Sequence, residues 1–536
     1  MKSANPNIAA RLMERVAQHP DRIAIVEYVG GQARRVTFGA LATRVAALAS
    51  GLRARGVEPG DRVLLFIPMS IDLYLALLGC LHLGATAVFV DAWADRHRLD
   101  AAVGAAHPKA FIGGPKAHLL RLFSDAVRRI PIRLVAGRRW LCLERYERSH
   151  RVSPAAPVAP DDPALITFTA DSRGAPQATA RSHAFLWAQH QALAAYLGLT
   201  EADINMPALP VCVLNNLALG VTSVLPDFDP RRLAEIDPAT LYHQLTAEKV
   251  TTSSGPPAFY ERLAGWCAHH HRWLPLRALF TGGAPVLPPL ARLLQRTVMG
   301  MVHVVYGSTT APIADIEVGE MLCAMATEKP GSRPEGICVG SPVPGIAVRL
   351  VRPYDGPIDL EAGGWQKWEA PLGEVGEVVI AGAPVLASYL AYPAADGQHK
   401  IRDGDRAWYR TGDAARLDEK GRLWLMGRVR GRVQRGDCVW WSVPAELRAL
   451  DVADITHAAY LGVPHLHFGQ RAVLCVEAPR GELSPAERQA LLAALSPIPV
   501  DELHVLRHIP RDLRHASKTD TAALRCLLSA RRSQAV

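Results

Sequence analysis

Apolar and polar residues alternate with two different periods at the beginning of the chain. After Asn7, a residue type that often caps a helix, apolar side chains recur at helical spacing over residues 8–16. Two short runs rich in β-branched residues follow, at 23–26 and 35–38, and are typical of a strand hairpin. We therefore expect one helix and then two antiparallel strands.

Helical and strand patterns continue to alternate beyond residue 38. Apolar residues at helical spacing cover 38–52, and the turn around Gly60 leads into an apolar run at 63–67. A second helical pattern over 72–83 is followed by another short apolar run at 87–90. This order is typical of a parallel sheet covered by helices. Further strands are expected at 110–112, 134–135, 165–168, 279–280 and 302–305.

The pattern changes twice in the second half of the chain. After about residue 345, short strands alternate with Gly and Pro turns, which indicates a β-rich subdomain. After Gly427, helical and strand patterns return in a stretch of ordinary domain size. We predict an α/β protein with a large N-terminal domain, residues 1–427, whose β-rich subdomain covers about 345–427. A small mobile α+β C-terminal domain, residues 428–536, completes the prediction.

The composition fits a folded chain of more than one domain. The chain has 536 residues, of which 49% are hydrophobic and 21% charged. A net charge of +9 permits binding to anions such as nucleotides, acidic carrier domains or membrane surfaces. Because the basic residues are not interleaved with aromatic residues, we expect no nucleic-acid partner.

Cysteine usage and hydropathy suggest where the protein works. The nine cysteines lie far apart without a C-x-x-C pair, which argues against a disulfide framework and a zinc site. No apolar stretch has the length and continuity of a membrane span or a signal peptide. We therefore expect a cytoplasmic protein. The triplet His269–His271 is expected to be exposed surface, because consecutive helical residues point in different directions.

The segment 165–183 has the features of a phosphate-binding loop. A buried strand is followed by small and hydroxyl residues and then by the expected start of a helix. Such a loop needs backbone N–H groups and hydroxyls that converge on phosphate oxygens, and usually a lysine that offsets their charge.

This segment resembles the T-S-G-S-T-G-x-P-K-G loop of the adenylate-forming superfamily, which includes acyl-CoA synthetases, peptide-synthetase adenylation domains and luciferases. The positions that agree are Thr169, Ser172, Gly174, Pro176, Ser182 and His183. The positions that differ are Ala170, Asp171, Arg173, Gln177 and Ala178. The resemblance implies that Thr169, Ser172 and Gly174 bind the nucleotide and that His183 lies near the chemistry. Arg173 or Arg181 could replace the missing lysine.

Two further stretches resemble the nucleotide-binding elements of the same superfamily. The first, which is expected to pack along the adenine, consists of Gly282, Gly283, Ala284 and Pro285. In the second, the resemblance implies that Tyr306 stacks on adenine, with Gly307 and Ser308 beside it, and that Thr309 meets the α-phosphate. The family has a Mg²⁺-binding Glu where this chain has Thr310, so no metal ligand is assigned unless Asp315 or Glu317 substitutes.

Three charged residues complete the resemblance. Asp413 lies in a Y-x-T-G-D stretch and is expected to accept hydrogen bonds from both ribose hydroxyls. Arg428 ends a G-x-L-x-L-x-G-R stretch, in which the family's arginine adjoins the ribose at an interdomain hinge. Lys518 ends a stretch similar to P-R-T-x-x-G-K, whose lysine contacts carboxylate and α-phosphate oxygens. The expected catalytic residues are therefore Lys518, Thr309 and His183, and the expected cofactors are ATP and Mg²⁺.

Within the superfamily, the chain resembles the β-lactone synthetase of bacterial olefin biosynthesis. Stretches at 7–11, 110–113, 219–230 and 338–341 carry this likeness. Such enzymes activate a β-hydroxy acid with ATP, and the neighbouring hydroxyl then displaces AMP without CoA. The loss of the family's hinge acid and lysine, at Gly431 and Gln434, is compatible with that chemistry. Acyl contacts are expected from the segments 207–220 and 253–257, although both also fit ordinary core packing.

Three functions remain open at this point. The first is an active ligase for fatty or β-hydroxy acids that forms an acyl-AMP, with an internal hydroxyl, CoA or an acyl-carrier protein as acceptor. The second is a pseudoenzyme that binds an acyl ligand, a nucleotide or a protein partner without turnover, as the changes at Asp171, Gln177 and Thr310 would allow. The third is an acyl-CoA synthetase.

Overall fold

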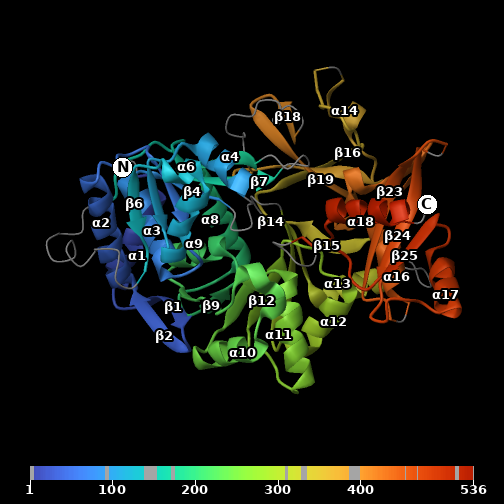
Figure 1. Ribbon diagram of the computed structural model, residues 1–536, viewed down its shortest axis with the longest axis horizontal. Coiled ribbons are helices and arrows are strands. Elements are labelled where there is room, and N and C mark those ends of the chain that lie inside the picture. Colours follow the sequence, from blue (N-terminus) through green and yellow to red (C-terminus); the bar gives the residue numbers. More distant parts are fainter. Residues whose placement is uncertain are drawn as a thin grey trace. The chain divides into compact units, whose positions relative to one another are not determined.

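A computed structural model gives the structure of the chain (Figure 1). It describes residues 5–534 except 91–95, 138–153, 171–175, 308–311, 328–334, 362, 386–398, 453, 468 and 513–517. The described residues fall into two compact units. The first lies within residues 1–255, 274–279 and 383–397, and the second within 256–273, 280–382 and 398–536. The predicted boundary at 427/428 marks a different division and stays a prediction.

The first unit begins with the expected helix and hairpin. The side chain of Asn7 accepts a hydrogen bond from the Ala9 N–H and caps α1 (Ile8–Gln18). Antiparallel strands β1 (Ile23–Val29) and β2 (Gln32–Thr37) follow. On its other edge, β1 continues through parallel strands in the order β10 (Thr222–Val224), β9 (Ile204–Pro207), β11 (Thr252–Gly255).

A second sheet in this unit contains six strands. Their order is β6 (Ile132–Val135), β5 (Ala110–Gly113), β3 (Arg62–Phe66), β4 (Thr86–Phe89), β7 (Pro163–Ala170), β8 (Pro176–Ser182). All neighbours are parallel except β7 and β8. The helices of the unit include α2 (Phe38–Ala54), α3 (Ile71–Leu83), α4 (Arg96–Ala106), α8 (His183–Leu197), α9 (Pro210–Leu219) and α10 (Pro238–Ala247), with short turns η1 (Pro115–Leu119), α5 (Leu120–Phe123), α6 (Asp125–Arg128) and η2 (Pro230–Glu235). Apolar residues of α2, α3 and the parallel strands form one buried cluster, as the sequence pattern predicted.

The second unit contains the expected β-rich region. Antiparallel neighbours follow the order β16 (Ala347–Val351), β17 (Gly376–Ala381), β19 (Arg406–Leu417), β20 (Leu423–Arg428), β15 (Ile337–Pro342), β14 (Pro312–Glu317), β13 (Met301–Gly307), and β18 (Lys400–Asp403) pairs with β19. The helices are α11 (Pro257–His269), α12 (Pro288–Thr297), α13 (Val318–Thr327) and α14 (Gly364–Trp368). Strand β12 (Ala278–Gly282) runs from one unit into the other.

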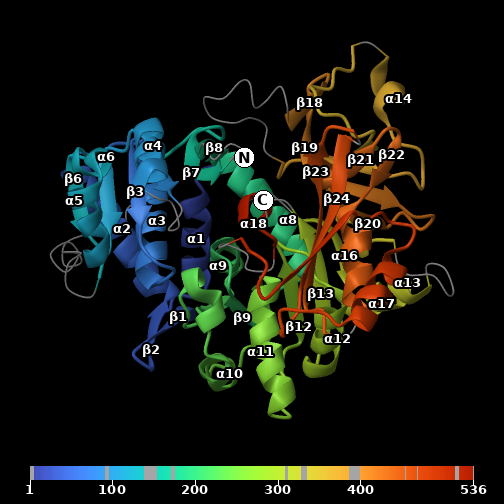
Figure 2. The same ribbon diagram turned by 45° about the vertical axis from the view of Figure 1, so that its right-hand side comes forward.

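The last part of the second unit has a sheet of its own. After η3 (Val429–Gly431) and the hairpin β21 (Val433–Arg435) and β22 (Cys438–Trp440), strands β23 (His457–His465), β24 (Gly469–Glu477) and β25 (Glu502–Leu506) pair in that order. Alternate residues of these strands belong to two buried clusters. One cluster includes residues of α16 (Ser442–Leu450) and α17 (Pro485–Leu495), and the other includes residues of α18 (Thr521–Gln534) (Figures 1 and 2). All members of both clusters lie after Gly427, and the predicted C-terminal domain stays a prediction.

The α/β fold class predicted from the sequence is confirmed. None of the helices in the described part of the chain is long and apolar enough to cross a membrane.

Candidate active site

Asp413, Tyr306 and Arg428 form a hydrogen-bonded group in the second unit. Asp413 on β19 lies directly opposite Arg428 on β20 in the antiparallel register. The Arg428 Nη1 atom lies 2.6 Å from Asp413 Oδ1, and the Tyr306 hydroxyl, from β13, donates to Asp413 Oδ2 at 2.9 Å. Each carboxylate oxygen can accept about two hydrogen bonds, so each keeps room for one more donor. Asp413 can therefore accept hydrogen bonds from two further hydroxyls, and the prediction that these belong to a ribose stays a prediction.

The charges in this group stabilise one protonation state. Burial and the nearby Asp413 carboxylate raise the pKa of Tyr306 well above its ordinary value, so this phenol remains a hydrogen-bond donor. The Asp413 carboxylate also raises the pKa of Arg428, which stays cationic. The group thus holds a tyrosine donor, a carboxylate acceptor and a guanidinium without requiring a proton transfer.

A buried ion pair that the sequence analysis missed holds the turn before Asp413. Arg410 donates to Glu377 Oε2 through Nη2 at 2.6 Å, and both side chains are buried. The other oxygen of Glu377 accepts the Gly412 N–H at 3.1 Å, and the Thr411 hydroxyl donates to the Val378 carbonyl at 2.9 Å. The signal was present in the sequence, because Glu377 is an acid at the start of an otherwise apolar strand.

The adenine-side turn is built on a glycine that has no room for a side chain. A Cβ atom on Gly282 would lie 2.4 Å from the Val305 carbonyl oxygen on the neighbouring strand. Gly283 has a φ of 86°, in the left-handed region that favours glycine. Ala284 and Pro285 continue this turn, and Pro285 is exposed. Of the second predicted adenine element, Tyr306 and Gly307 are described, whereas Ser308, Thr309 and Thr310 lie outside the described residues.

Lys518 lies between two residues near the C-terminus that form an antiparallel β-bridge. Arg511 and Thr519 form a β-bridge, and the Asp512 N–H donates to the Lys518 carbonyl at 2.8 Å. Part of the Lys518 side chain is exposed, but burial of the rest by protein atoms lowers its pKa. The Asp413 carboxylate opposes this shift, and the Arg428 guanidinium adds to it. Lys518 therefore belongs to the same charged neighbourhood as Asp413 and Arg428.

Glu477, at the end of β24, anchors the segment that leads to Lys518. Its Oε2 accepts the Ile509 N–H at 2.9 Å and its Oε1 accepts from Arg511 Nη2 at 3.1 Å. On the other side, His457 Nε2 lies 3.0 Å from the Thr519 hydroxyl. Sequence reasoning found Lys518 from its local pattern but missed these anchors, because they come from distant strands.

The predicted phosphate loop has a different context from the one expected. Strand β7 is followed by the antiparallel strand β8, with Thr169 opposite Gln177, and α8 begins only at His183. The expected helix begins at the end of this segment, but residues 176–182 form a strand that the sequence analysis did not predict. Asp171, Ser172, Arg173 and Gly174 lie outside the described residues.

Arg181 lies on β8 opposite Leu165, toward the other end of the β7–β8 pair from this loop. Its side chain is 7% exposed, its Nη1 donates to the Thr167 hydroxyl at 2.9 Å, and burial lowers its pKa to about 10. Among the described residues, no carboxylate pairs with it. The guanidinium is still charged at neutral pH, and its replacement of the missing lysine stays a prediction.

His183 is 1% exposed at the start of α8. Its Nδ1 accepts the Ile8 N–H at 3.1 Å, and burial lowers its pKa to about 4. The imidazole is therefore neutral, with the Nδ1 lone pair already used to join α1 to α8. Its catalytic role stays a prediction.

The two acids suggested as substitutes for a metal ligand have other partners. Asp315 Oδ2 lies 3.1 Å from His303 Nδ1, and Glu317 Oε2 accepts the Gly319 N–H at 2.7 Å. Within the described ranges, no three His, Cys, Asp or Glu side chains are grouped to hold a metal ion. Both acids are therefore already hydrogen-bonded within the second unit, and their use as metal ligands stays a prediction.

Comparisons with known proteins agree with this geometry. The sequence model of the AMP-binding enzyme family matches residues 12–390. Olefin β-lactone synthetase of Stenotrophomonas maltophilia is 34% identical over 96% of both chains, and that of Xanthomonas campestris is 32% identical over 96% of this chain and 95% of the relative. ATP-bound MatB of Rhodopseudomonas palustris matches with a TM-score of 0.78 at 23% identity, over 98% of this chain and 99% of that chain. This structural likeness shows the adenylate-forming fold.

Proposed function

Because the chain belongs to the family of AMP-binding enzymes and is an AMP-forming ligase of that family, we propose that it activates a fatty or β-hydroxy acid with ATP and closes a β-lactone. The observation that carries the proposal is the joint placement of Tyr306, Asp413 and Arg428 with Lys518. The similarity to olefin β-lactone synthetases over nearly the whole chain supports the choice of substrate.

In the first step, a carboxylate oxygen of the acid attacks the α-phosphorus of ATP and pyrophosphate leaves. Asp413 accepts hydrogen bonds from the ribose hydroxyls, which fixes the nucleotide, and Tyr306 and Arg428 keep that carboxylate oriented. Lys518 donates to the oxygens on which negative charge develops. Arg181 contributes the positive charge that Gln177 cannot supply.

In the second step, the β-hydroxyl oxygen of the same molecule attacks the acyl carbon. AMP leaves, a four-membered ester forms and the hydroxyl proton passes to solvent. The hydroxyl is held within the same molecule, so its effective concentration is high and CoA is not required. Mg²⁺ is an expected companion of ATP, and it would be held mainly by the triphosphate and water.

The test is acid-dependent release of pyrophosphate. The whole chain is incubated with ATP, Mg²⁺ and a panel of fatty and 3-hydroxy acids, with and without CoA, and products are identified by mass spectrometry. We expect pyrophosphate, AMP and a lactone from 3-hydroxy acids without CoA. Absence of pyrophosphate from every acid would overturn the proposal. A strict requirement for CoA would instead indicate an acyl-CoA synthetase. A feruloyl-CoA synthase of Amycolatopsis is 29% identical to this chain.

Lys518→Ala is expected to lower the rate of pyrophosphate release by about 100-fold or more, because one preorganised donor is lost. Lys420→Ala removes an exposed lysine from the same unit and is the matched control. Equal rates for both variants would contradict the role proposed for Lys518.

The second candidate, a pseudoenzyme, is favoured by the departures at Asp171, Gln177 and Thr310. It predicts that no acid panel yields pyrophosphate even if ATP raises the melting temperature. If the double variant Gln177→Lys, Thr310→Glu then gains turnover, the remaining geometry is intact and only these positions had been lost. An inert double variant would indicate deeper loss of function.

A further inference from the structure

Three large apolar side chains of the first unit are exposed to solvent close together. They are Leu119 in η1 and Leu122 and Phe123 in α5, with exposed fractions of 55%, 72% and 63%. Because they are spaced three and four residues apart, they lie on one side of this short helical segment. Ala117 and Leu120 of the same segment pack against a buried cluster instead. We call Leu119, Leu122 and Phe123 the outer row.

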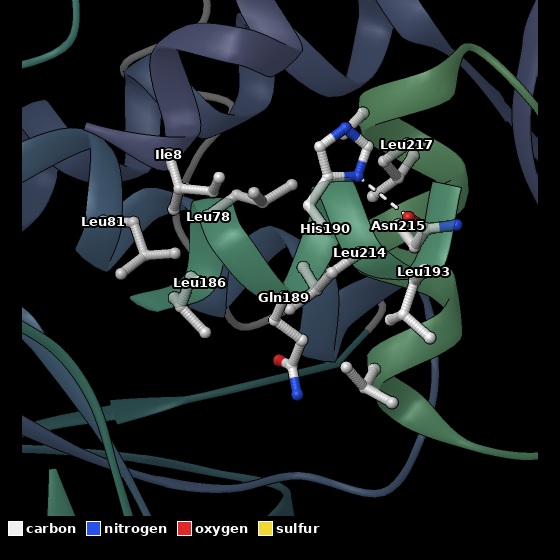
Figure 3. Close-up of a pocket in the computed structure, with 12 residues that line it drawn as sticks. Ile8, Leu78, Leu81, Leu186, Gln189, His190, Leu193, Leu214, Asn215 and Leu217 are labelled. Atoms are coloured by element: carbon white, nitrogen blue, oxygen red, sulfur yellow. Dashed lines mark hydrogen bonds between the residues drawn. The ribbon is translucent and has the colours of Figure 1, made fainter. Parts of the chain in front are cut away.

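Other leucines of this unit are covered by neighbouring helices. Figure 3 shows Leu78, Leu81, Leu186 and Leu217 gathered between α3, α8 and α9, and their exposed fractions are 4%, 0%, 7% and 1%. Single exposed apolar residues are common on protein surfaces, but neighbouring ones mark contact surfaces. The outer row is therefore a candidate contact surface.

The chain around the outer row is rich in positive charge. Asp125 is the one acid in residues 115–133, and it pairs with Arg128. Arg133 Nη2 donates to the Arg128 carbonyl at 2.7 Å, which places this guanidinium at the end of α6. Helix α6 contacts α5 (Figure 2). The basic side chains of residues 115–133 are Lys116, Arg121, Arg128, Arg129 and Arg133.

An anionic bilayer complements both features of this surface. Apolar side chains enter the boundary between head groups and acyl chains, while Lys and Arg side chains remain at the negatively charged surface. A protein interface of standard size takes about 20–30 residues on each side, whereas the outer row offers three large apolar side chains. A lipid surface, which needs no complementary shape, therefore fits better than a protein partner.

We propose that the outer row and the cations around it dock the protein reversibly on the surface of an anionic bilayer. The contact goes beyond acid activation, because neither ATP nor an acid takes part in it. Docking would also bring the enzyme to the phase in which long-chain acids dissolve, a consequence that rests on the proposed function.

Co-sedimentation of the whole chain with lipid vesicles tests the proposal. One set of vesicles holds equal parts of phosphatidylcholine and phosphatidylglycerol, and the other holds phosphatidylcholine alone. We expect binding to the mixed vesicles and at least about tenfold weaker binding to phosphatidylcholine, because the cations then have no partner. Raising NaCl from about 0.1 M to about 0.5 M should weaken binding to the mixed vesicles. The mixed vesicles should also slow hydrogen exchange of the amides in residues 115–124.

Two double variants separate the apolar and the charged contributions. Leu122→Ser, Phe123→Ser is expected to weaken binding at least about tenfold, because two large apolar groups no longer leave water. Arg128→Gln, Arg129→Gln is also expected to weaken it about tenfold. Each basic residue contributes about fivefold, and Asp125 already offsets part of the charge of Arg128.

Leu372→Ser is the matched control. Leu372 is 71% exposed, much like Leu122, but it lies between Glu369 and Glu374 rather than among cations. This variant should bind the mixed vesicles as the wild type does.

The proposal is overturned if the wild type does not bind the mixed vesicles, if Leu122→Ser, Phe123→Ser binds them as tightly as the wild type, or if Leu372→Ser weakens binding equally. Equal binding to both sets of vesicles would refute the role of the cations. If no vesicle binds and the serine variant abolishes self-association in sedimentation velocity, the outer row joins two copies of the chain instead. If the serine variant does not fold, the arginine variant and hydrogen exchange decide the question. These measurements need no turnover, so failure of the proposed ligase activity would leave them interpretable.

Discussion

Replacement of Glu377 by glutamine should loosen the strands that carry Asp413. The carboxylate of Glu377 is 4% exposed and lies against Arg410, which is 7% exposed, so Glu377→Gln removes the charge that Glu377 sets against this buried guanidinium. Removing one partner of a buried pair costs about 3–5 kcal/mol. Arg410 keeps the carbonyls of Tyr354 and Gly356, and the glutamine amide can still accept one hydrogen bond, so we expect the lower end, about 3 kcal/mol.

Hydrogen exchange of the amides in β17 and β19 measures this effect where it occurs. A loss of about 3 kcal/mol in opening free energy corresponds to roughly a hundredfold faster exchange, since about 1.4 kcal/mol is tenfold. ATP affinity should fall as well, because the Gly412 N–H loses the oxygen that fixes the turn before Asp413.

Glu369→Gln is the matched control. It breaks a pair with Arg349 in the same β-rich region, but those side chains are 45% and 35% exposed, and such pairs contribute at most about 1 kcal/mol. Equal exchange rates in the two variants would refute the argument that burial makes the Glu377 pair matter.

Three further predictions concern pH, packing and charge. Burial raises the pKa of Glu446 from 4.5 to about 7, so the folded state holds a proton that the unfolded state releases. The free energy of unfolding should therefore fall by up to about 3 kcal/mol as the pH rises from about 4.5 to 7. Urea titrations at several pH values measure this slope, and Glu446→Gln should flatten it. Gly282→Ala forces a methyl group against the Val305 carbonyl and should cost about 1–3 kcal/mol of stability. It should also weaken ATP binding, measured by calorimetry. Unchanged binding would contradict the close packing of Gly282 against Val305. Arg181→Gln should weaken ATP binding about tenfold or more, whereas Arg181→Lys should retain most of it; equal affinities for both would exclude the charge as the cause.

Local sequence determined much of the fold. Asn7 and the helical spacing after it predicted α1, and the short apolar runs predicted β3, β4 and β5 close to their observed bounds. These elements depend on periodicity and end signals that are readable within ten or twenty residues. The same locality explains why the stretch that ends at Asp413 is recognisable from its residues alone.

The phosphate loop shows the limit of local patterns. Small and hydroxyl residues before His183 predicted a strand, a loop and a helix, yet residues 176–182 are a strand paired with β7. Pairing with a neighbouring strand overrides weak local preference, because the ladder hydrogen bonds come from another part of the chain.

The sequence by itself determined the α/β class and the order of the stretches that resemble nucleotide-binding elements, and it predicted roles for Asp413, Arg428 and Lys518, because each depends on a short local pattern. Only the tertiary structure decided that Glu377 orients the turn before Asp413 and that His190 pairs with Asn215 between α8 and α9. The physical reason is that burial and hydrogen-bond partners depend on residues that are distant along the chain and become neighbours only on folding.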